Sequence, residues 1–456
     1  MVELALNCQV LLWLIVLGVF LASGQASVFH PALIYLGFHG LVFVLRPLLV
    51  HYFHFDAAWN YMRFMPQDED FVKTLAVTSV ALVVFVSVSL VVGRARVDFL
   101  SDEAPSFSPV QRRAWVLANW LLVPLAAYSI FATRNGVAGE RVNGIWIMTN
   151  STGYVNDAQL IAGPILCVWL VLTRFHWLNF PLIVLYVGYR SFIGWARWTI
   201  LLLFLLIVLA YCWHTRKRWL PLWSLGVAVP VLILFTILGH NRGYFHVLLI
   251  GGQSEIVTYD AGLSAAEKAR IKYDTQDFAN FDYLTFVLSF MPKRTGGNYT
   301  YGAQYLQLFT EPIPRILWKG KPVGAPVRTF NISQYGNFVG LTFSLVGDAW
   351  CSGGWVGVII MLALAAGVLG LFHRWFWRNQ SNGMAALFYI SALAMTPQWF
   401  RDGGISIAKF MLWTWLPLLV WLGMTWPAAG RFFPVYSVLL PRGARIRFVQ
   451  PKKTER

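Results

Sequence analysis

Apolar runs of about 20 residues recur along almost the whole chain, and they decide which folds are open to it. Residues 200–210 contain no polar side chain at all. As a helix, a run of about 20 residues is long enough to cross a hydrocarbon core of roughly 30 Å. Only 12% of the residues are charged, whereas a soluble domain of this size carries about 25%. We therefore expect an all-α polytopic integral membrane protein.

The apolar runs predict about 11 transmembrane helices, within a range of roughly 10–13. The second run is apolar again after Arg46-Pro47, so its helix could extend to Phe53. The first run resembles a signal peptide, but a signal peptide begins with basic residues and this chain has Glu3 there. We expect that run to be retained as a helix. The predicted spans are residues 8–22, 28–46, 72–93, 114–132, 158–173, 178–192, 196–213, 220–239, 350–372, 384–400 and 408–426.

Lys and Arg residues between the predicted spans indicate how the chain is oriented. Basic residues of membrane proteins collect in the cytoplasmic loops. With about 11 spans, the basic clusters all fall on one face, which puts the amino terminus outside and the carboxyl terminus inside. This distribution also accounts for the net charge of +16 without nucleic-acid binding. The clusters are Arg94/Arg96, Arg112/Arg113, Arg216/Lys217/Arg218, Arg374/Arg378 and the tail from Arg431 to Arg456.

One long polar segment, residues 240–349, interrupts the series of spans. We predict a large periplasmic loop there, between eight spans in residues 1–239 and three in residues 350–430, with a basic cytoplasmic tail in residues 431–456. Within the loop, Ser264 to Glu267 form a capping-box pattern. The apolar residues 278–290 are too few to cross a membrane, and we expect an amphipathic helix lying on the membrane or against the bundle.

A second set of cations falls on the outer face in this topology, where short loops normally avoid Arg. Several of them held near one face suggest an anionic ligand, since Arg binds phosphate or carboxylate through two parallel hydrogen bonds. We expect a cationic pocket for a lipid-linked pyrophosphate. The alternative is that each side chain reaches separately to lipid headgroups. The candidates are Arg190, Arg197, Arg242, Arg315, Lys321 and Arg401.

Aromatic side chains and one acid complete the candidate site. Aromatic faces pack on the C–H faces of sugars, but the same residue types also line membrane interfaces. Asp348 stands where the loop meets the ninth span, so it could act as a general base or pair with an Arg. Its alternative role is to cap the amino terminus of that span. The candidate glycan-binding residues are Tyr299, Tyr301, Tyr305 and Trp318.

The sequence contains no specific motif for a metal site or a disulfide framework. The four cysteines have no C-x-x-C spacing, so neither a disulfide framework nor a zinc site is predicted. The acidic run Asp68-Glu69-Asp70 leaves open a metal-dependent glycosyltransferase that uses a polyprenyl-monophosphate sugar. The simpler interpretation is the charged first turn of the next helix, because acids stabilise helix amino termini. We expect no metal and no cofactor.

Several motifs together resemble one family of membrane enzymes. The most specific is the string Pro314-Arg315-Ile316-Leu317-Trp318 with Lys321-Pro322 in the long loop. The others are Tyr189-Arg190, Tyr301-Gly302, Gly347-Asp348-Ala349-Trp350 and Gly354-Trp355-Val356-Gly357. With these residues the chain resembles, over about residues 185–405, the oligosaccharide repeat unit polymerases, which are the O-antigen polymerase type of bacterial membrane glycosyltransferases.

The resemblance implies a substrate and a reaction. Members of the family act at the periplasmic face of the inner membrane on oligosaccharides linked to undecaprenyl pyrophosphate. They move the growing glycan from its lipid onto the non-reducing end of another lipid-linked unit, without a nucleotide sugar or a metal. Direct displacement would invert the anomeric centre, and Arg242 and Arg315 would stabilise the charge on the leaving pyrophosphate. Partners would be a chain-length regulator and a flippase, and not nucleic acid.

The general base stays open. Related ligases carry a functional His in their large periplasmic loop, but here no His occurs between His246 and His373. This weakens the alternative of an O-antigen ligase, which transfers the glycan to lipid A core. His240 and His246 flank Arg242 but could simply end a helix, and the other candidates for the base are Asp348 and Glu311, of which we prefer Asp348. The alternative of another class is a lipid-oligosaccharide flippase. Transporters usually contain internal repeats, and this sequence has no matching halves.

Overall fold

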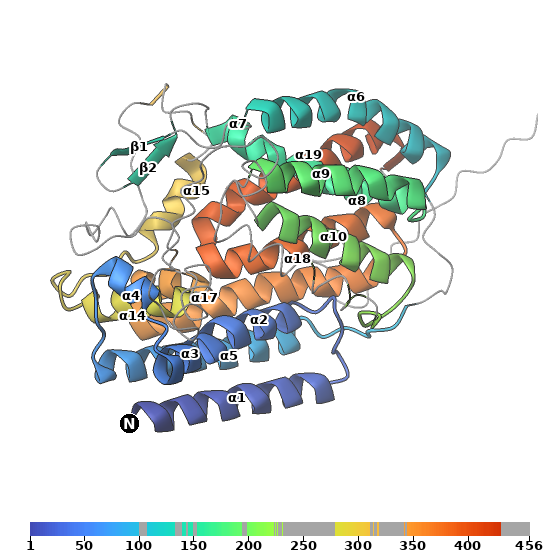
Figure 1. The fold of residues 1–456 in the computed structure, drawn as a ribbon. Helices are drawn as coiled ribbons and strands as arrows, with labels where there is room; N and C mark the ends of the chain where they lie inside the picture. Colours follow the sequence, from blue (N-terminus) through green and yellow to red (C-terminus); the bar gives the residue numbers. More distant parts are fainter. Residues whose placement is uncertain are drawn as a thin grey trace, which may run out of the picture.

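Figure 1 shows a bundle of helices in the computed structural model of the chain. The described elements are helical except for one antiparallel pair of short strands, β1 (Gly139–Val142) and β2 (Ile145–Met148). The helical architecture expected from the apolar runs is confirmed. The structure describes residues 1–99, 107–132, 139–142, 145–148, 153–193, 198–222, 279–310 and 344–429, and singly residues 224, 226, 230, 313, 317, 318 and 342.

The amino-terminal part of the chain forms three long helical segments joined by short turns. Pro31 opens the second segment, and the His30 ring caps it by accepting a hydrogen bond from the Ala32 N–H at 3.1 Å. This segment continues through a π-helix, so the predicted extension to Phe53 is confirmed. The elements are α1 (Val2–Ala22), α2 (Pro31–His39), the π-helix η1 (Gly40–Leu45), α3 (Arg46–Phe53), α4 (Ala57–Met62) and α5 (Asp68–Val92).

The remaining helices form two groups along the chain, and the long ones run roughly parallel to the axis of α1 in Figure 1. The first group is α6 (Pro109–Ala132), α7 (Gly153–Ala158), η2 (Gln159–Ile161), α8 (Ala162–Leu172), η3 (Trp177–Asn179), α9 (Phe180–Ile193) and α10 (Trp198–His214). The second group is α14 (Asn280–Phe290), η5 (Ala303–Leu306), α15 (Gln307–Thr310), α17 (Ser344–Arg378), α18 (Gly383–Asp402) and α19 (Gly404–Ala429).

Six helices in the described part of the chain are long and apolar enough to cross a membrane. They coincide with the first four, the ninth and the eleventh of the predicted spans. Shorter or less apolar helices, α8, α9, α10 and α18, occupy four more, whereas residues 220–239 lie almost entirely outside the description. These helices indicate a membrane protein, while the count of about 11 stays a prediction. The six are Val2–Ala22, Pro31–Phe53, Asp68–Val92, Pro109–Ala132, Ser344–Arg378 and Ile407–Thr425.

Two apolar clusters form the core, and α17 contributes to both. One cluster combines α1, α2, α5 and α14 with most of α17, and the other combines α6, α8, α10, α18 and α19 with its last turns. In Figure 1, α17 accordingly lies between the blue amino-terminal helices and the green and red ones. Ser344–Arg378 is also the longest described helical segment, and it is interrupted by a kink at Gly353 and Gly354.

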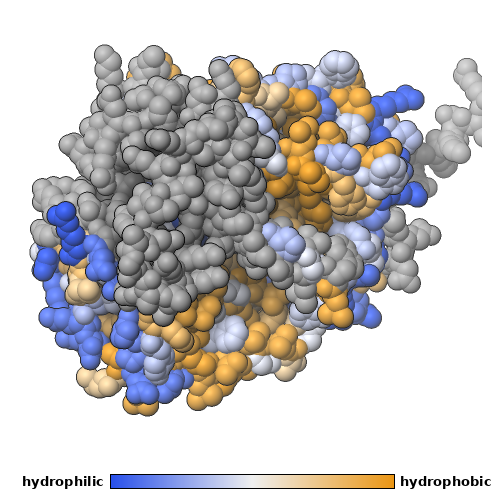
Figure 2. Space-filling model, viewed as in Figure 1, coloured by the Kyte–Doolittle hydropathy of each residue, from blue (hydrophilic) through white to orange (hydrophobic). Residues whose placement is uncertain are grey.

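The outside of the bundle is also apolar. Leu14, Trp120 and Val356 are 51%, 78% and 64% exposed, respectively. In Figure 2 the coloured hydrophobic residues lie right of centre and along the lower part of the view, and the most hydrophilic residues lie toward its left and right edges. An apolar exterior of this extent is unfavourable in water but suits contact with lipid, which agrees with the helix lengths.

Helix α14 lies inside the bundle, although it belongs to the segment predicted as a periplasmic loop. Nearly all its residues are buried. Its Asp282 forms a two-pronged ion pair with Arg46 of α3, with N–O distances of 2.8 and 3.1 Å and side-chain exposures of 0% and 3%. Of the two predicted placements, on the membrane or against the bundle, the second is confirmed. The predicted capping box at residues 264–267 lies outside the described residues.

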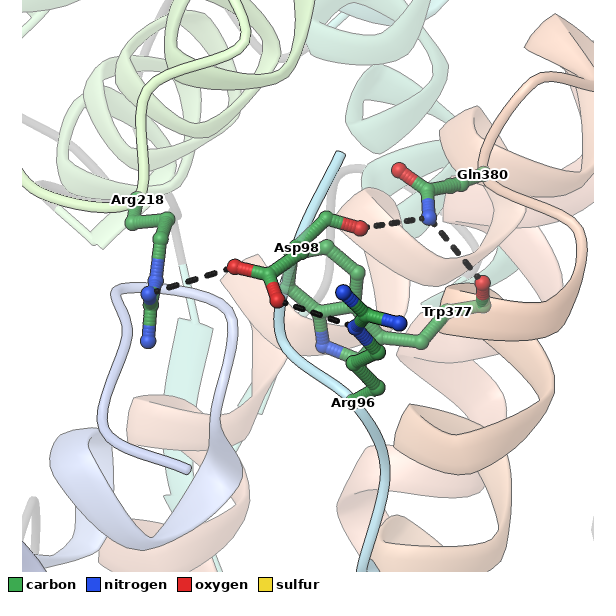
Figure 3. A network of polar contacts seen from close by, with 5 residues as sticks. All are labelled: Arg96, Asp98, Arg218, Trp377 and Gln380. Carbon is green, nitrogen blue, oxygen red and sulfur yellow. Dashed lines mark hydrogen bonds and ion pairs between the residues drawn. The ribbon is translucent and has the colours of Figure 1, made fainter. Parts of the chain in front are cut away.

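Polar contacts gather at the two ends of the bundle, which we name after one aspartate each. At the Asp98 end, the Gln380 amide donates to the Asp98 carbonyl oxygen at 2.9 Å (Figure 3). Arg218 donates there to the Asp98 carboxylate at 3.5 Å. At the Asp348 end lie α14, α15 and the first residues of α17 and α19, with α4, α14 and α15 toward the left of Figure 1.

The basic clusters predicted to share one face do meet at the Asp98 end. Arg94, Arg96, Arg374 and Arg378 line one cavity there. Arg216 donates to the Gln380 carbonyl oxygen at 3.3 Å. The Arg112/Arg113 pair is brought to the same region because the Trp421 indole donates to the carbonyl oxygen of Gln111 at 2.8 Å. The basic tail, residues 431–456, lies outside the described residues.

Candidate functional site

The structure places some of the predicted site residues and leaves the others outside the described residues. Those outside are Arg197, Arg242, Arg315 and Lys321. Those placed are Arg190, Asp348, Arg401, Tyr299, Tyr301, Tyr305 and Trp318. Asp348, Tyr305 and Arg401 come together around the amino end of α19, and this is the candidate site.

The Asp348 carboxylate is the best-defined feature of the site. The residue is 4% exposed. One carboxylate oxygen accepts a 2.6 Å hydrogen bond from the Tyr305 hydroxyl and a 3.0 Å bond from the Gly404 N–H. The other accepts a bond from the Gln304 amide at 3.2 Å. Three donors from two parts of the chain, residues 304–305 and Gly404, therefore replace water around a buried charge, as its burial requires.

Asp348 was considered as a possible cap of its own helix, and this interpretation is wrong. The helix α17 begins at Ser344, so Asp348 lies within its second turn. Its carboxylate instead accepts the N–H of Gly404, the first residue of α19. The first N–H groups of a helix have no partner inside it. Asp348 thus caps α19, a helix that begins 56 residues later.

Two glycines make this close approach possible, and the sequence interpretation missed both. Gly403 has φ +85, and a Cβ atom there would lie 3.1 Å from the Asp348 carboxylate. A Cβ atom on Gly404 would lie 2.7 Å from the Tyr305 ring. The available signal was the Gly-Gly pair between two apolar runs, directly after Arg401-Asp402.

The helix α17 is kinked close to Asp348. Gly353 and Gly354 have non-helical backbone angles, with φ +59 at Gly354. The Cys351 carbonyl oxygen beside the kink accepts bonds from the Thr300 N–H at 2.8 Å and the Thr300 hydroxyl at 2.9 Å. Thr300 and Gln304 therefore anchor the 299–306 segment to α17, since Gln304 also donates to the Ser352 hydroxyl at 2.7 Å.

The predicted glycan-binding aromatics differ in their surroundings. Tyr299 packs against Tyr301 and Trp350, and its hydroxyl lies 2.8 Å from the space that a Cβ on Gly354 would fill. Tyr301 is 75% exposed and Trp318 is 39% exposed. Tyr299 and Tyr305 therefore have structural contacts, whereas Tyr301 and Trp318 present surface to a ligand. Whether any of them binds a glycan stays a prediction.

Arg190 of α9 belongs to a second polar group, which contacts α19 further along that helix. It is 1% exposed and donates to the Gln159 side chain. Two residues before Gln159 in the sequence, Asp157 accepts from Lys409 of α19 at 2.5 Å. Lys409 follows Gly404 by about 7.5 Å along the helix axis. The first turns of α19 thus touch both polar groups, one through Gly404 and one through Lys409.

Arg401, at the end of α18, is the third residue of the candidate site. Its side chain is 28% exposed and lies 3.5 Å from the Asp402 carboxylate. Its carbonyl oxygen accepts a 3.1 Å hydrogen bond from the Asn280 amide of α14. Arg401 therefore stands at the junction of α14, α18 and α19, with enough exposure for its guanidinium to reach a ligand.

The described charges of the site balance. The cations Arg190, Arg401 and Lys409 stand near three carboxylates, Asp157, Asp348 and Asp402. An excess of positive charge for a pyrophosphate would thus have to come from the predicted cations outside the described residues. Burial and the adjacent Asp348 carboxylate raise the pKa of Tyr305 well above its usual range, so its phenol remains a neutral donor.

The described residues contain no group of three or more His, Cys, Asp or Glu side chains placed to hold a metal ion. The acidic run of Asp68, Glu69 and Asp70 forms the first turn of α5. This position supports the interpretation as a charged helix amino terminus, where acids interact favourably with the helix dipole.

Comparison of the chain with protein-family models, with curated proteins and with solved structures gave no match.

Proposed function

We propose that the protein polymerises lipid-linked oligosaccharide repeat units. In this reaction, a glycan moves from undecaprenyl pyrophosphate to the non-reducing end of another lipid-linked unit. The observation that carries the proposal is the meeting of Asp348, Tyr305 and Arg401 at the amino end of α19. Asp348 belongs to the Gly347-to-Trp350 string that resembles the polymerases, and Tyr305 and Arg401 are the predicted glycan and pyrophosphate contacts beside it. The proposal includes about 11 spans, an inner-membrane location and a site that faces the periplasm.

The main requirement of this glycosyl transfer is positive charge around the leaving pyrophosphate. The acceptor hydroxyl attacks the anomeric carbon, the bond from that carbon to the pyrophosphate oxygen breaks, and the electron pair leaves with the lipid pyrophosphate. Arginines stabilise the charge that develops on that oxygen. We assign this role to Arg401, whose side chain is partly exposed. Because the charges of the described residues balance, further positive charge must come from the other predicted cations, Arg197, Arg242, Arg315 and Lys321.

Arg190 fits the proposal as a positioning residue. Its guanidinium is buried against Gln159, beside the Asp157–Lys409 ion pair that holds α19. A buried guanidinium fixes the packing of α9 on this part of the bundle, which sets the position of Arg401 through α19. Direct contact of Arg190 with the pyrophosphate is the predicted alternative, and it requires the ligand to enter between α9 and α19.

The acceptor proton must pass to a base, and Asp348 was the preferred candidate. The three hydrogen bonds to its carboxylate favour a different role. The three donors occupy most of the roughly four lone-pair sites of the carboxylate, so an incoming proton would have to compete with them. We propose that Asp348 holds Tyr305 and the α19 terminus in place, and that the base is a separate group.

The test is turnover of a defined repeat unit on undecaprenyl pyrophosphate by the purified protein in lipid nanodiscs. We expect a ladder of longer lipid-linked glycans, unchanged by EDTA. Arg401→Ala should reduce the ladder, whereas the matched control Arg174→Ala, an exposed arginine beyond α8, should not. Transfer only to lipid A core would identify a ligase, and movement of lipid-linked units without any new glycosidic bond would identify a flippase. Either result would overturn the proposal.

A further inference from the structure

A cavity of about 810 Å³ opens at the Asp98 end, opposite the candidate site. It lies between the turn after α1, the segment after α5 and the last turns of α17. Arg94, Arg96, Arg374 and Arg378 line it, together with Gln25 and Gln380. None of these residues takes part in the proposed reaction, so the cavity needs its own explanation.

The lining of the cavity carries an excess of positive charge. It contains four arginines and one carboxylate, Asp98, which gives a formal net charge of +3 for these residues. Asp98 is already engaged, because it accepts from Arg96 at 3.2 Å and from Arg218 at 3.5 Å (Figure 3). An open cavity with this charge attracts anions, and guanidinium groups match the oxygens of phosphate.

The cavity also has a fixed polar frame. The Gln380 side chain donates to the carbonyl oxygens of Asp98 at 2.9 Å and Trp377 at 3.3 Å (Figure 3). The backbone oxygen of Gln380 in turn accepts from the Trp213 indole at 2.9 Å. These contacts hold the segment after α5 against the end of α17, which sets the spacing of the arginines on the two elements.

Two buried acceptors on this frame have no donor among the described residues. They are the side-chain carbonyl oxygens of Gln25 and Gln380. The Gln25 amide nitrogen is engaged with the Leu90 carbonyl oxygen at 3.3 Å, which leaves its oxygen to accept. Both oxygens are shielded from solvent, so the charged groups that the cavity offers to a ligand are its arginines.

The rim of the cavity is apolar on the side that faces the membrane. Val91 lines the cavity and is 76% exposed. Near the end of α1, two residues before the cavity-lining Ser23, Leu21 is 50% exposed. A soluble phosphate compound would gain nothing from this rim, whereas the acyl chains of a lipid would cover it.

We propose that the cavity binds the headgroup of an anionic glycerophospholipid from the adjacent leaflet. The arginines contact the phosphate, and the acyl chains lie along α1 and α5. Basic pockets between helix ends are a recognised mode of binding for such headgroups. The competing explanation is that Arg374 and Arg378 only complement the carboxyl-terminal dipole of α17.

The test is native mass spectrometry of the full-length protein with phosphatidylglycerol, cardiolipin or phosphatidylcholine. We expect adducts with the two anionic lipids and few with phosphatidylcholine. The double variant Arg94→Gln/Arg374→Gln should weaken anionic lipid binding by about tenfold or more. The matched control Arg112→Gln/Arg113→Gln removes the same charge from exposed residues of α6 that do not line the cavity, and it should bind as the wild type does.

Three results would overturn the proposal. Equal loss in the control would show a diffuse surface charge, and full retention in the cavity variant would show helix-end complementation only. Competition by sn-glycerol 3-phosphate or inorganic phosphate at the lipid's own concentration would show a soluble-anion site. If the glutamine variant does not fold, Arg94→Lys/Arg374→Lys keeps the charge, and its weaker binding in the same measurement serves as the test.

Discussion

At the Asp348 end the charged side chains are buried or half-buried against polar partners, whereas at the Asp98 end arginines line an open cavity. Arg190 is 1% exposed, but the side chain of Arg96 is 86% exposed. The same residue type therefore serves two purposes. A buried guanidinium fixes the positions of the helices around it, while an exposed one remains able to bind a partner from outside.

The difference follows from the strength of electrostatic interactions in the two places. A charge removed from water interacts far more strongly with its neighbours than an exposed charge, and it costs far more if a neighbour is lost. Substitutions at the Asp348 end should thus have large effects on stability or activity. Substitutions at the Asp98 end should leave the fold nearly unchanged and act on what binds there.

The largest effect is expected at the Arg46–Asp282 pair, which ties α14 to α3 near the Asp348 end. Asp282→Asn would leave the Arg46 guanidinium buried without its counter-charge. We expect a loss of about 3–5 kcal/mol in the free energy of unfolding. Thermal unfolding in detergent micelles would measure it. The double variant Arg46→Met/Asp282→Leu should recover most of this loss, because neither charge is then stranded; if it does not, the pair has a role beyond charge compensation.

The next effect concerns Asp348 and Tyr305. Tyr305→Phe removes the 2.6 Å bond to the carboxylate, and hydrogen bonds to charged groups contribute about 1.5–3 kcal/mol. We expect polymer formation to fall by roughly 10-fold to 100-fold, since the α19 terminus loses part of its anchor. Asp348→Asn should lower the rate similarly.

The dependence of the rate on pH separates positioning from catalysis. If Asp348 only positions its neighbours, Asp348→Asn lowers the rate at every pH and keeps the shape of the profile. Loss of the acidic limb of the profile in this variant would instead identify Asp348 as the base. Ser352→Ala is a suitable control, because it removes a neighbouring hydroxyl and leaves the three donors to the carboxylate in place.

How much of this arrangement was predictable depends on how far apart in the sequence its partners lie. The helices were predictable because an apolar run of sufficient length has few alternatives in a membrane. A helix within residues 278–290 was likewise expected from the local pattern, but α14 is buried on nearly all its faces, so the expectation that it is amphipathic was wrong. The clustering of basic residues at one end followed from charge alone.

The partners of the buried polar groups were not predictable. Arg46 and Asp282 are 236 residues apart, and Asp348 and Gly404 are 56 apart. Apolar periodicity says which face of a helix is buried but not which helix lies against it. The sequence interpretation therefore recognised Asp348 as a candidate and missed Gln304, Gly403 and Gly404, the residues that define its surroundings.

A smaller effect is expected from the titration of Tyr305. Its pKa is raised in the folded protein, so the neutral phenol contributes stability that is fully present below the unfolded pKa of about 10. That contribution is lost as the pH rises further, by at most about 1.4 kcal/mol per pH unit. Tyr305→Phe should thus flatten the fall in unfolding free energy between about pH 10 and 11. An unchanged slope would mean that Tyr305 titrates normally and that its bond to Asp348 is weak.

The smallest effect is expected at the Arg96–Asp98 pair, whose side chains are 86% and 52% exposed. Asp98→Asn should change the free energy of unfolding by less than about 1 kcal/mol, because water screens an exposed pair. The same variant should strengthen binding of anionic lipid, since it removes the one carboxylate of the cavity lining. A stability loss as large as that of Asp282→Asn would show that Asp98 is a structural anchor like Asp348. The two ends would then differ in the exposure of their charged side chains but not in what those side chains contribute to stability.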